Sequence, residues 1–208
     1  MDTANIARLL EPFIRLDEMR LAAISKYIDI LLKWNARINL TAIRAPEEIV
    51  ERHFGESLFA AKHILAQGPI KTAIDLGSGA GFPGVPFALL APEIQVTLIE
   101  SNQKKSTFLK ELIYLLGLRN VKVFSGRAES YSQSADLVML RAVEKFAEVL
   151  PLALRLVSPD GRLALLIGTA QVELAKSLLL GVRWQEPVVI PSGHSRVLLV
   201  GTKIVKVK

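Results

Sequence analysis

The chain has 208 residues, half of them apolar, a formal net charge of +6 and a pI of about 9.7. It has no cysteine, which excludes disulfides, thiolate metal ligands and a cysteine nucleophile, and its three scattered histidines lead us to expect no metal. No apolar run is long enough to span a membrane and no secretory signal is visible, so we expect a cytoplasmic protein. Its basic character suits a polyanionic partner such as RNA.

Residues 1–67 are predicted to form a helical cap. Apolar residues recur every three or four positions between Leu16 and Trp34, which indicates one face of a helix that Asp17 can cap. A second helix is expected to begin at Pro46 and to end near Leu65, and Thr41 is a candidate cap for it. No strand pattern interrupts these helices, so the cap is not a second sheet domain.

From residue 68 onward strands and helices alternate, which predicts a mainly parallel sheet with helices on both faces. The expected strands are Lys71–Leu76, Gln95–Glu100, Val121–Ser125, Asp136–Leu140, Arg162–Ile167, Trp184–Ile190 and Ser195–Thr202. The expected helices are Phe82–Ala91, Lys104–Leu116, Glu144–Val157 and Gln171–Leu180. No helix separates the last two strands, so one terminal strand should be antiparallel. We therefore predict an α/β fold for residues 68–208: a Rossmann-like, seven-stranded, mainly parallel sheet with an antiparallel terminal strand.

The most informative run, Thr72–Pro86, reads as a strand, a glycine turn and the start of a helix. Gly79–Gly84 fits the dinucleotide pattern G-x-G-x-x-G, and Glu100 lies about twenty residues later, where a ribose-binding acid belongs. Asp75 would repel a pyrophosphate, however, and two prolines in the run remove N–H donors. S-adenosylmethionine has a ribose, a cationic sulfonium and no phosphate, so it suits the run better. A structural turn without a ligand is the third reading.

Residues that can bind a cofactor follow the carboxyl ends of four strands, where open α/β sheets hold their ligands. These candidates are Asp75, Gly77, Ser78, Gly79, Gly81, Phe82, Glu100, Ser101, Ala128, Glu129 and Arg141. Glu100 is placed to accept both ribose hydroxyls, and Ala128 and Glu129 would border the adenine. Arg141 would face the methionine carboxylate or an RNA phosphate.

Basic residues around the mouth of this site are the candidates for binding RNA. They are Arg52, His53, Lys104, Lys105, Arg141 and Arg196. Either lysine can equally be a solvated surface charge, and His53 can equally be a packed helix residue. We expect Thr41, with Asn35 and Asn39, to fix the cap connection rather than to touch substrate.

Along nearly its whole length the chain resembles the RsmG family, also called glucose-inhibited division protein B. The resemblance rests on Trp34-Asn35 with Ile38–Thr41, Arg52–Phe54 with Glu56-Ser57, Asp75–Pro86, Glu100-Ser101 with Lys104-Lys105 and Phe108-Leu109, Arg127–Glu129 and Arg141-Ala142. It implies a class I methyltransferase fold and an S-adenosylmethionine-dependent enzyme that methylates N7 of a guanine in bacterial 16S ribosomal RNA. It also matches Gly77, Phe82, Ala128, Glu129 and Arg141 to positions that contact the cofactor. The chain departs from the family where Glu56 replaces a frequent aspartate and Leu140 a frequent serine.

Methylation at guanine N7 agrees with the absence from the sequence of two motifs that other methyltransferases use. Guanine N7 carries a free lone pair and needs no general base, and the chain has neither an Asn-Pro-Pro-Tyr motif nor a cysteine. Two alternatives remain: a dinucleotide-binding reductase, and a non-catalytic RNA-binding module with a methyltransferase fold. The small cap and the few aromatic residues lead us to expect a monomer.

Overall fold

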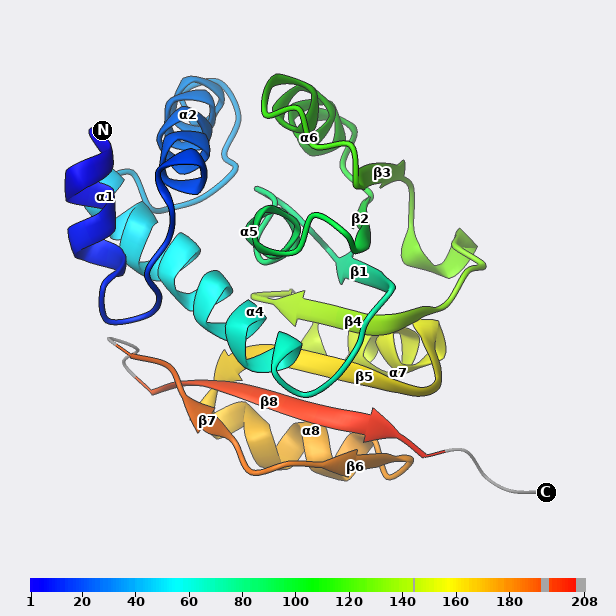
Figure 1. Ribbon diagram of the computed structural model, residues 1–208. Helices are drawn as coiled ribbons and strands as arrows, with labels where there is room; N and C mark the ends of the chain where they lie inside the picture. Colours follow the sequence, from blue (N-terminus) through cyan, green and yellow to red (C-terminus); the bar gives the residue numbers. More distant parts are fainter. Residues whose placement is uncertain (144, 192–194, 205–208) are drawn as a thin grey trace.

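The computed structural model describes residues 1–143, 145–191 and 195–204. A single twisted sheet runs through the molecule and carries helices on both faces (Figure 1). Its strands are β1 (Thr72–Leu76), β2 (Gln95–Glu100), β3 (Val121–Ser125), β4 (Ala135–Arg141), β5 (Val157–Gly168), β6 (Val182–Trp184), β7 (Val188–Val189) and β8 (Arg196–Lys203). The order across the sheet is β3-β2-β1-β4-β5-β8-β6, and β7 also pairs with β8. Strands β1 to β5 are parallel and β8 is antiparallel to its neighbours, as predicted.

The helices follow the predicted alternation. They are α1 (Thr3–Leu10), α2 (Glu18–Asn35), α3 (Pro46–Glu48), a π-helical segment η1 (Ile49–Gly55), α4 (Glu56–Leu65), α5 (Gly84–Leu90), α6 (Gln103–Leu115), α7 (Phe146–Leu156) and α8 (Val172–Leu178), with short 3-10 turns η2 (Ala128–Ser130) and η3 (Thr169–Gln171). Among the residues described, no helix is both long and apolar enough to cross a membrane.

Of the three residues expected to cap or begin helices within residues 1–67, two are confirmed. The Asp17 carboxylate accepts a hydrogen bond from the backbone N–H of Arg20 at the start of α2, and Pro46 occupies the first turn of α3. The Thr41 cap is wrong, because Ala45 precedes α3 without a side-chain cap. The side chain of Asn35 holds this connection, as expected, since its oxygen accepts from the backbone N–H groups of Leu40 and Thr41.

Alternating side chains along each central strand divide the core in two. Leu163, Leu165 and Ile167 of β5 face α7 and α8, whereas Ala164 and Leu166 face the opposite side. On that opposite side α2, α4, α5 and α6 cover the sheet (Figure 1). Side chains of the N-terminal helices and of one sheet face therefore pack in one continuous core.

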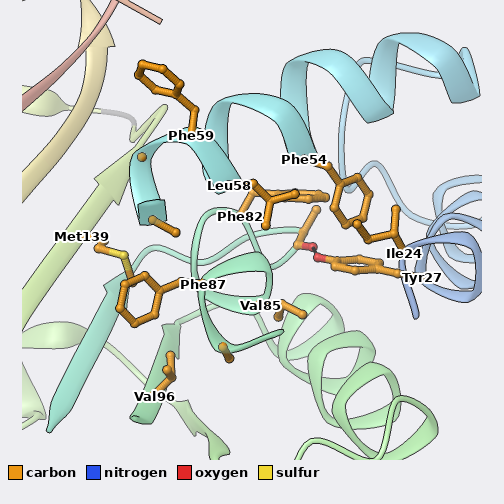
Figure 2. Close-up of a cluster of buried hydrophobic side chains, with 14 of the residues drawn as sticks. Ile24, Tyr27, Phe54, Leu58, Phe59, Phe82, Val85, Phe87, Val96 and Met139 are labelled. Carbon is orange, nitrogen blue, oxygen red and sulfur yellow. Dashed lines mark hydrogen bonds between the residues drawn. The ribbon is translucent and has the colours of Figure 1, made fainter. Parts of the chain in front are cut away.

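An aromatic stack connects the N-terminal helices to the glycine turn (Figure 2). The ring of Phe82, in the turn after β1, lies parallel to Tyr27 of α2 at 5.2 Å between centroids. Phe54 of η1 meets both rings edge-on at 5.0 Å. The hydroxyl of Tyr27 donates to the backbone carbonyl of Ala80, so α2 holds the turn by packing and by a hydrogen bond.

The strand predicted over Trp184–Ile190 is interrupted. Both β6 and β7 lie along the edge of β8 that faces away from β5, because Thr202 and Leu198 each pair with β5 on one side and with β6 or β7 on the other. Pro187, which has no N–H to donate, stands between them. In the part of the chain that the structure describes, eight strands thus replace the predicted seven; residues 192–194 of the predicted turn lie outside that part.

Candidate cofactor and RNA site

A cleft of about 950 Å³ opens at the carboxyl ends of β1, β2, β3 and β4, the edge where the sequence predicts the site. Eleven of the predicted site residues line it: His53, Gly77, Ser78, Gly79, Phe82, Glu100, Ser101, Lys105, Ala128, Glu129 and Arg141. Five others are not among the residues that line it: Arg52, Asp75, Gly81, Lys104 and Arg196. Of the cap, Leu40, Thr41 and His53 form one wall.

The glycine turn after β1 needs its glycines for backbone conformation. Gly77 and Gly79 have φ values of +74° and +56°, in the left-handed region where a Cβ is strained. The N–H groups of Gly77 and Ser78 donate to the carbonyl of Ile99 in β2 at 3.0 and 3.1 Å. The turn is thus fixed across two strands and lays its backbone along the floor of the cleft.

Asp75 braces this turn from behind. Its side chain is fully buried and one carboxylate oxygen accepts from the N–H of Gly84 at 2.9 Å. Burial raises the pKa of Asp75 to about 7, although the hydrogen bonds from Gly84 and Ser78 oppose the rise. The residue lies outside the cleft lining, so it acts on the cofactor site through the turn.

The same contacts weigh against a dinucleotide. Each glycine N–H of the G-x-G-x-x-G match has an acceptor within the protein: Gly79 donates to Glu100, Gly81 to the carbonyl of Ser78, and Gly84 to Asp75. A pyrophosphate would need those donors free. The reductase alternative therefore loses its main support.

Glu100 presents a fixed carboxylate at the end of β2. One oxygen accepts from the N–H of Asn102 at 2.8 Å and the other from the N–H of Gly79 at 2.9 Å. Each oxygen keeps a second lone pair, so the group can accept two more hydrogen bonds from a vicinal diol. Beyond it, Arg155 holds η2 by donating to the carbonyl of Ala128 at 2.9 Å, which sets the adjoining rim of the cleft.

Arg141 and Glu56 form a buried charge network at the opposite end. Glu56, at the start of α4, accepts through Oε2 from Nε and Nη2 of Arg141 at 3.2 and 3.1 Å and from Arg196 at 3.4 Å. Arg141 Nη2 also donates to the backbone carbonyl of Arg52 in the π-helical segment at 2.7 Å. Two of the predicted RNA-binding or cofactor-binding arginines are thus engaged with one acid.

His53 is built into the cap wall. Its ring stacks on Phe82 at 4.7 Å between centroids, Nδ1 lies 3.0 Å from Nη1 of Arg141, and Nε2 lies 2.8 Å from the hydroxyl of Thr41. Burial, and then the positive charges of Arg141, Arg52 and Arg196, lower the pKa of His53 to about 3. A neutral imidazole with both nitrogens in hydrogen bonds is typical of a packed helix residue, the second of the two alternatives for His53, rather than of a cation that binds RNA.

The comparisons with known proteins agree with this architecture. A family model described as GidB, rRNA small subunit methyltransferase G, matches residues 20–178. A ribosomal RNA small subunit methyltransferase G of Chromobacterium violaceum is 38% identical over 196 residues, 92% of each chain. The chain belongs to the rRNA small subunit methyltransferase G family. A member from a Roseiflexus species is 39% identical over 205 residues, covering 92% of this chain and 86% of that one.

Solved structures support the fold of this family member. An S-adenosylmethionine-dependent methyltransferase from Aquifex aeolicus superposes with a TM-score of 0.58 at 19% identity, over 77% of this chain and 94% of that one. The structure of M. jannaschii TYW2 in complex with AdoMet superposes with a TM-score of 0.55 at 18% identity, over 71% of this chain and 75% of that one. Both the predicted family and the predicted Rossmann-like methyltransferase fold are confirmed.

Sequence reasoning assigned no role to Glu56 of this rRNA methyltransferase G relative. The acid was visible as part of the Glu56-Ser57 motif, and its surroundings, Phe54, Leu58 and Phe59, are apolar. A carboxylate among such residues needs a cationic partner. The partner, Arg141, lies 85 residues later, so the pairing itself was not predictable from local pattern.

Proposed function

We propose that this chain transfers the methyl group of S-adenosylmethionine to N7 of a guanine in small-subunit ribosomal RNA. The observation that carries the proposal is the fixed Glu100 carboxylate, which faces a 950 Å³ cleft beside the glycine turn in a member of this family. A carboxylate held there by two backbone donors is suited to a ribose diol, and nothing in the turn is arranged for phosphates.

The residues present fit the cofactor. The turn Gly77–Gly79 would pass beneath its methionyl part, Glu100 with Ser101 would hold the ribose, and Ala128 with Glu129 would border the adenine. Arg141 would supply positive charge near the methionine carboxylate. Asp75 and Gly81 would contribute from behind, by bracing the turn and by allowing Tyr27 to approach it.

When bound, the cofactor supplies an electrophilic methyl group. The protein has to hold guanine N7 in line with that group at about 3 Å and exclude water. It needs no base for this, because N7 carries a lone pair at neutral pH. His53 agrees with such a reaction, since both of its nitrogens are engaged within the protein.

RNA would approach over the cap, residues 1–67, and along the rim of the cofactor-binding domain, residues 68–208. Lys105 lines the cleft, and Lys104 and Arg52 are exposed beside it. His53 and Arg196 would act by shaping the wall rather than as free cations. We place the enzyme in the cytoplasm as a monomer, on small-subunit RNA.

The test is methyl transfer from labelled S-adenosylmethionine to small ribosomal subunits from cells that lack the corresponding gene. We expect label at a single guanine, mapped as 7-methylguanosine by cleavage at the modified base. Cofactor binding without transfer to subunits or naked RNA would favour the non-catalytic RNA-binding module. Preferential binding of a nicotinamide cofactor would favour the reductase.

A further inference from the structure

The cleft has two ends with different chemistry. Glu100 and Ala128, after β2 and β3, mark the end suited to the adenosine, whereas Thr41 and His53 of the cap lie at the β4 end, where His53 contacts Arg141. On the proposed function, on which this inference rests, the methyl-accepting base occupies the end that the adenosine leaves open. Thr41 is then the polar side chain that the cap offers to that base.

The hydrogen bonds around Thr41 fix the direction of its hydroxyl. Arginine has only donors, so Arg141 Nη1 donates to Nδ1 of His53, at 3.0 Å. A neutral imidazole whose Nδ1 accepts carries its proton on Nε2. Nε2 therefore donates to the hydroxyl oxygen of Thr41, at 2.8 Å.

The hydroxyl oxygen of Thr41 also accepts from the backbone N–H of Ile43 at 3.1 Å. A hydroxyl offers two lone pairs and one proton, so both of its acceptor positions are filled. Within residues 1–143, 145–191 and 195–204, no acceptor takes its proton. Thr41 lines the cleft, so it presents a pure hydrogen-bond donor there.

We propose that Thr41 donates this hydrogen bond to O6 of the target guanine and so selects guanine over adenine. O6 is the acceptor beside N7 in guanine, whereas adenine carries an amino donor at the same place. Because His53 and Ile43 fill the acceptor positions of Thr41, the hydroxyl cannot turn to accept from that amino group. Arg141, through His53, is a positioning residue for this contact.

The experiment is a cycle between enzyme and substrate. Small subunits are reconstituted with guanine, with 2-aminopurine, which keeps N7 and lacks O6, or with inosine, which keeps both. Wild type, Thr41→Val and Thr41→Ser are compared by kcat/KM for methyl transfer. We expect 2-aminopurine to lower the wild-type value about tenfold, the size of one lost neutral hydrogen bond.

The losses in kcat/KM caused by Thr41→Val and by 2-aminopurine should not multiply when the two changes are combined. Thr41→Val should lose about as much on guanine and little more on 2-aminopurine, because the same hydrogen bond is already missing. Thr41→Ser keeps the hydroxyl and should keep the wild-type ratio of guanine to 2-aminopurine, and inosine should behave as guanine. If the losses multiply, Thr41 has only a structural role and the proposal is overturned.

Two controls separate the possible failures. Affinity for S-adenosylmethionine, measured by calorimetry, should be unchanged in Thr41→Val; if that variant does not fold, Thr41→Ala provides a second deletion of the donor. An inactive wild type on guanine subunits would refute the proposed function. An active wild type with an unaltered preference in the donor-deleted variant would refute only the role of Thr41.

Discussion

Glu56 carries a buried negative charge between the guanidinium groups of Arg141 and Arg196. Its side chain is 3% exposed and that of Arg141 is 9% exposed, so water screens neither charge well. Removing one partner of such a group leaves the others uncompensated, which costs more than the interaction itself contributes. The wall of the cleft therefore depends on this single carboxylate.

We expect Glu56→Gln to lower the free energy of unfolding by about 3–5 kcal/mol, because the nearly buried guanidinium of Arg141 and the partly exposed one of Arg196 then face each other without an acid. Urea unfolding measures the change. Glu48→Gln is the matched control, since Glu48 pairs with Arg52 at an exposed surface and should change stability by under about 1 kcal/mol. Equal effects of the two variants would contradict the buried network.

The raised pKa of Asp75 leads us to expect that the stability of the protein depends on pH. Its pKa is about 7 in the folded chain against 3.8 as the ordinary value, so between these values the folded state retains a proton that the unfolded state releases. Stability from this group is therefore complete at low pH and is lost as the pH rises towards 7. Relative to Asp75→Asn, wild type should lose up to about 1.4 kcal/mol per pH unit between pH 5 and 7.

Urea unfolding of wild type and Asp75→Asn at pH 5, 6, 7 and 8 measures that difference, and other titrating groups cancel between them. The two curves should run in parallel above the pKa. A constant difference from pH 5 to 8 would show that Asp75 is ionised throughout.

Substitution of Glu100 should weaken the binding of the cofactor. Glu100→Gln removes the charge and turns one acceptor oxygen into a donor, so we expect affinity for S-adenosylmethionine to fall by about 10–100-fold, as for lost hydrogen bonds to a charged group. Calorimetry provides the measurement. Glu111→Gln, an exposed acid of α6 outside the cleft lining, should bind as wild type.

At the scale of elements, the glycine turn and helix α2 form one unit. Gly81 has a φ of +93°, and a Cβ there would collide with the hydroxyl of Tyr27 and come within 3.0 Å of Val85. Gly117 has a similar φ of +67° with nothing within 4 Å of an added Cβ. The two positions separate backbone strain from steric conflict.

We expect Gly117→Ala to destabilise by about 1–2 kcal/mol from left-handed strain alone. Gly81→Ala should lose about 1–3 kcal/mol more, from overpacking against α2, and should also bind S-adenosylmethionine more weakly. Thermal unfolding with calorimetric titration of both variants tests this. Identical losses of stability in the two variants would mean that α2 moves away from the added Cβ at position 81 without a cost in free energy.

The sequence predicted individual elements well and their mutual contacts poorly. The bounds of β2 and β3 are correct to the residue, and Asp17 and Pro46 start their helices, because caps and periodicity are local properties. The expected helix cap at Thr41 was wrong because its hydroxyl bonds to His53, a partner that only the folded connection brings near, whereas Asn35 holds that connection as expected. Nine of the eleven cofactor candidates line the cleft because strand ends of a parallel sheet meet at one edge; Asp75 and Gly81 do not.

At the scale of the whole molecule, the net charge of +6 matters through its distribution around the cleft. We expect Lys104→Gln with Lys105→Gln to weaken RNA binding and to reduce the slope of log K against log salt by about 1–2. Filter binding over a salt series measures the slope. The charge-matched control is Lys71→Gln with Lys122→Gln, at the amino-terminal side of the sheet, which should leave the slope nearly unchanged.

The position of β8 imposes an order on assembly during synthesis. β8 lies between β5 and the strands β6 and β7, yet it is translated after all of them. Until it emerges from the ribosome, the apolar strand β5 has an unpaired edge, the kind of surface that promotes association between chains. Arg196, at the start of β8, then joins Glu56 and Arg141 last. The nascent chain can thus form its glycine turn early, whereas the charge network of the cleft is completed only when the final strand is in place.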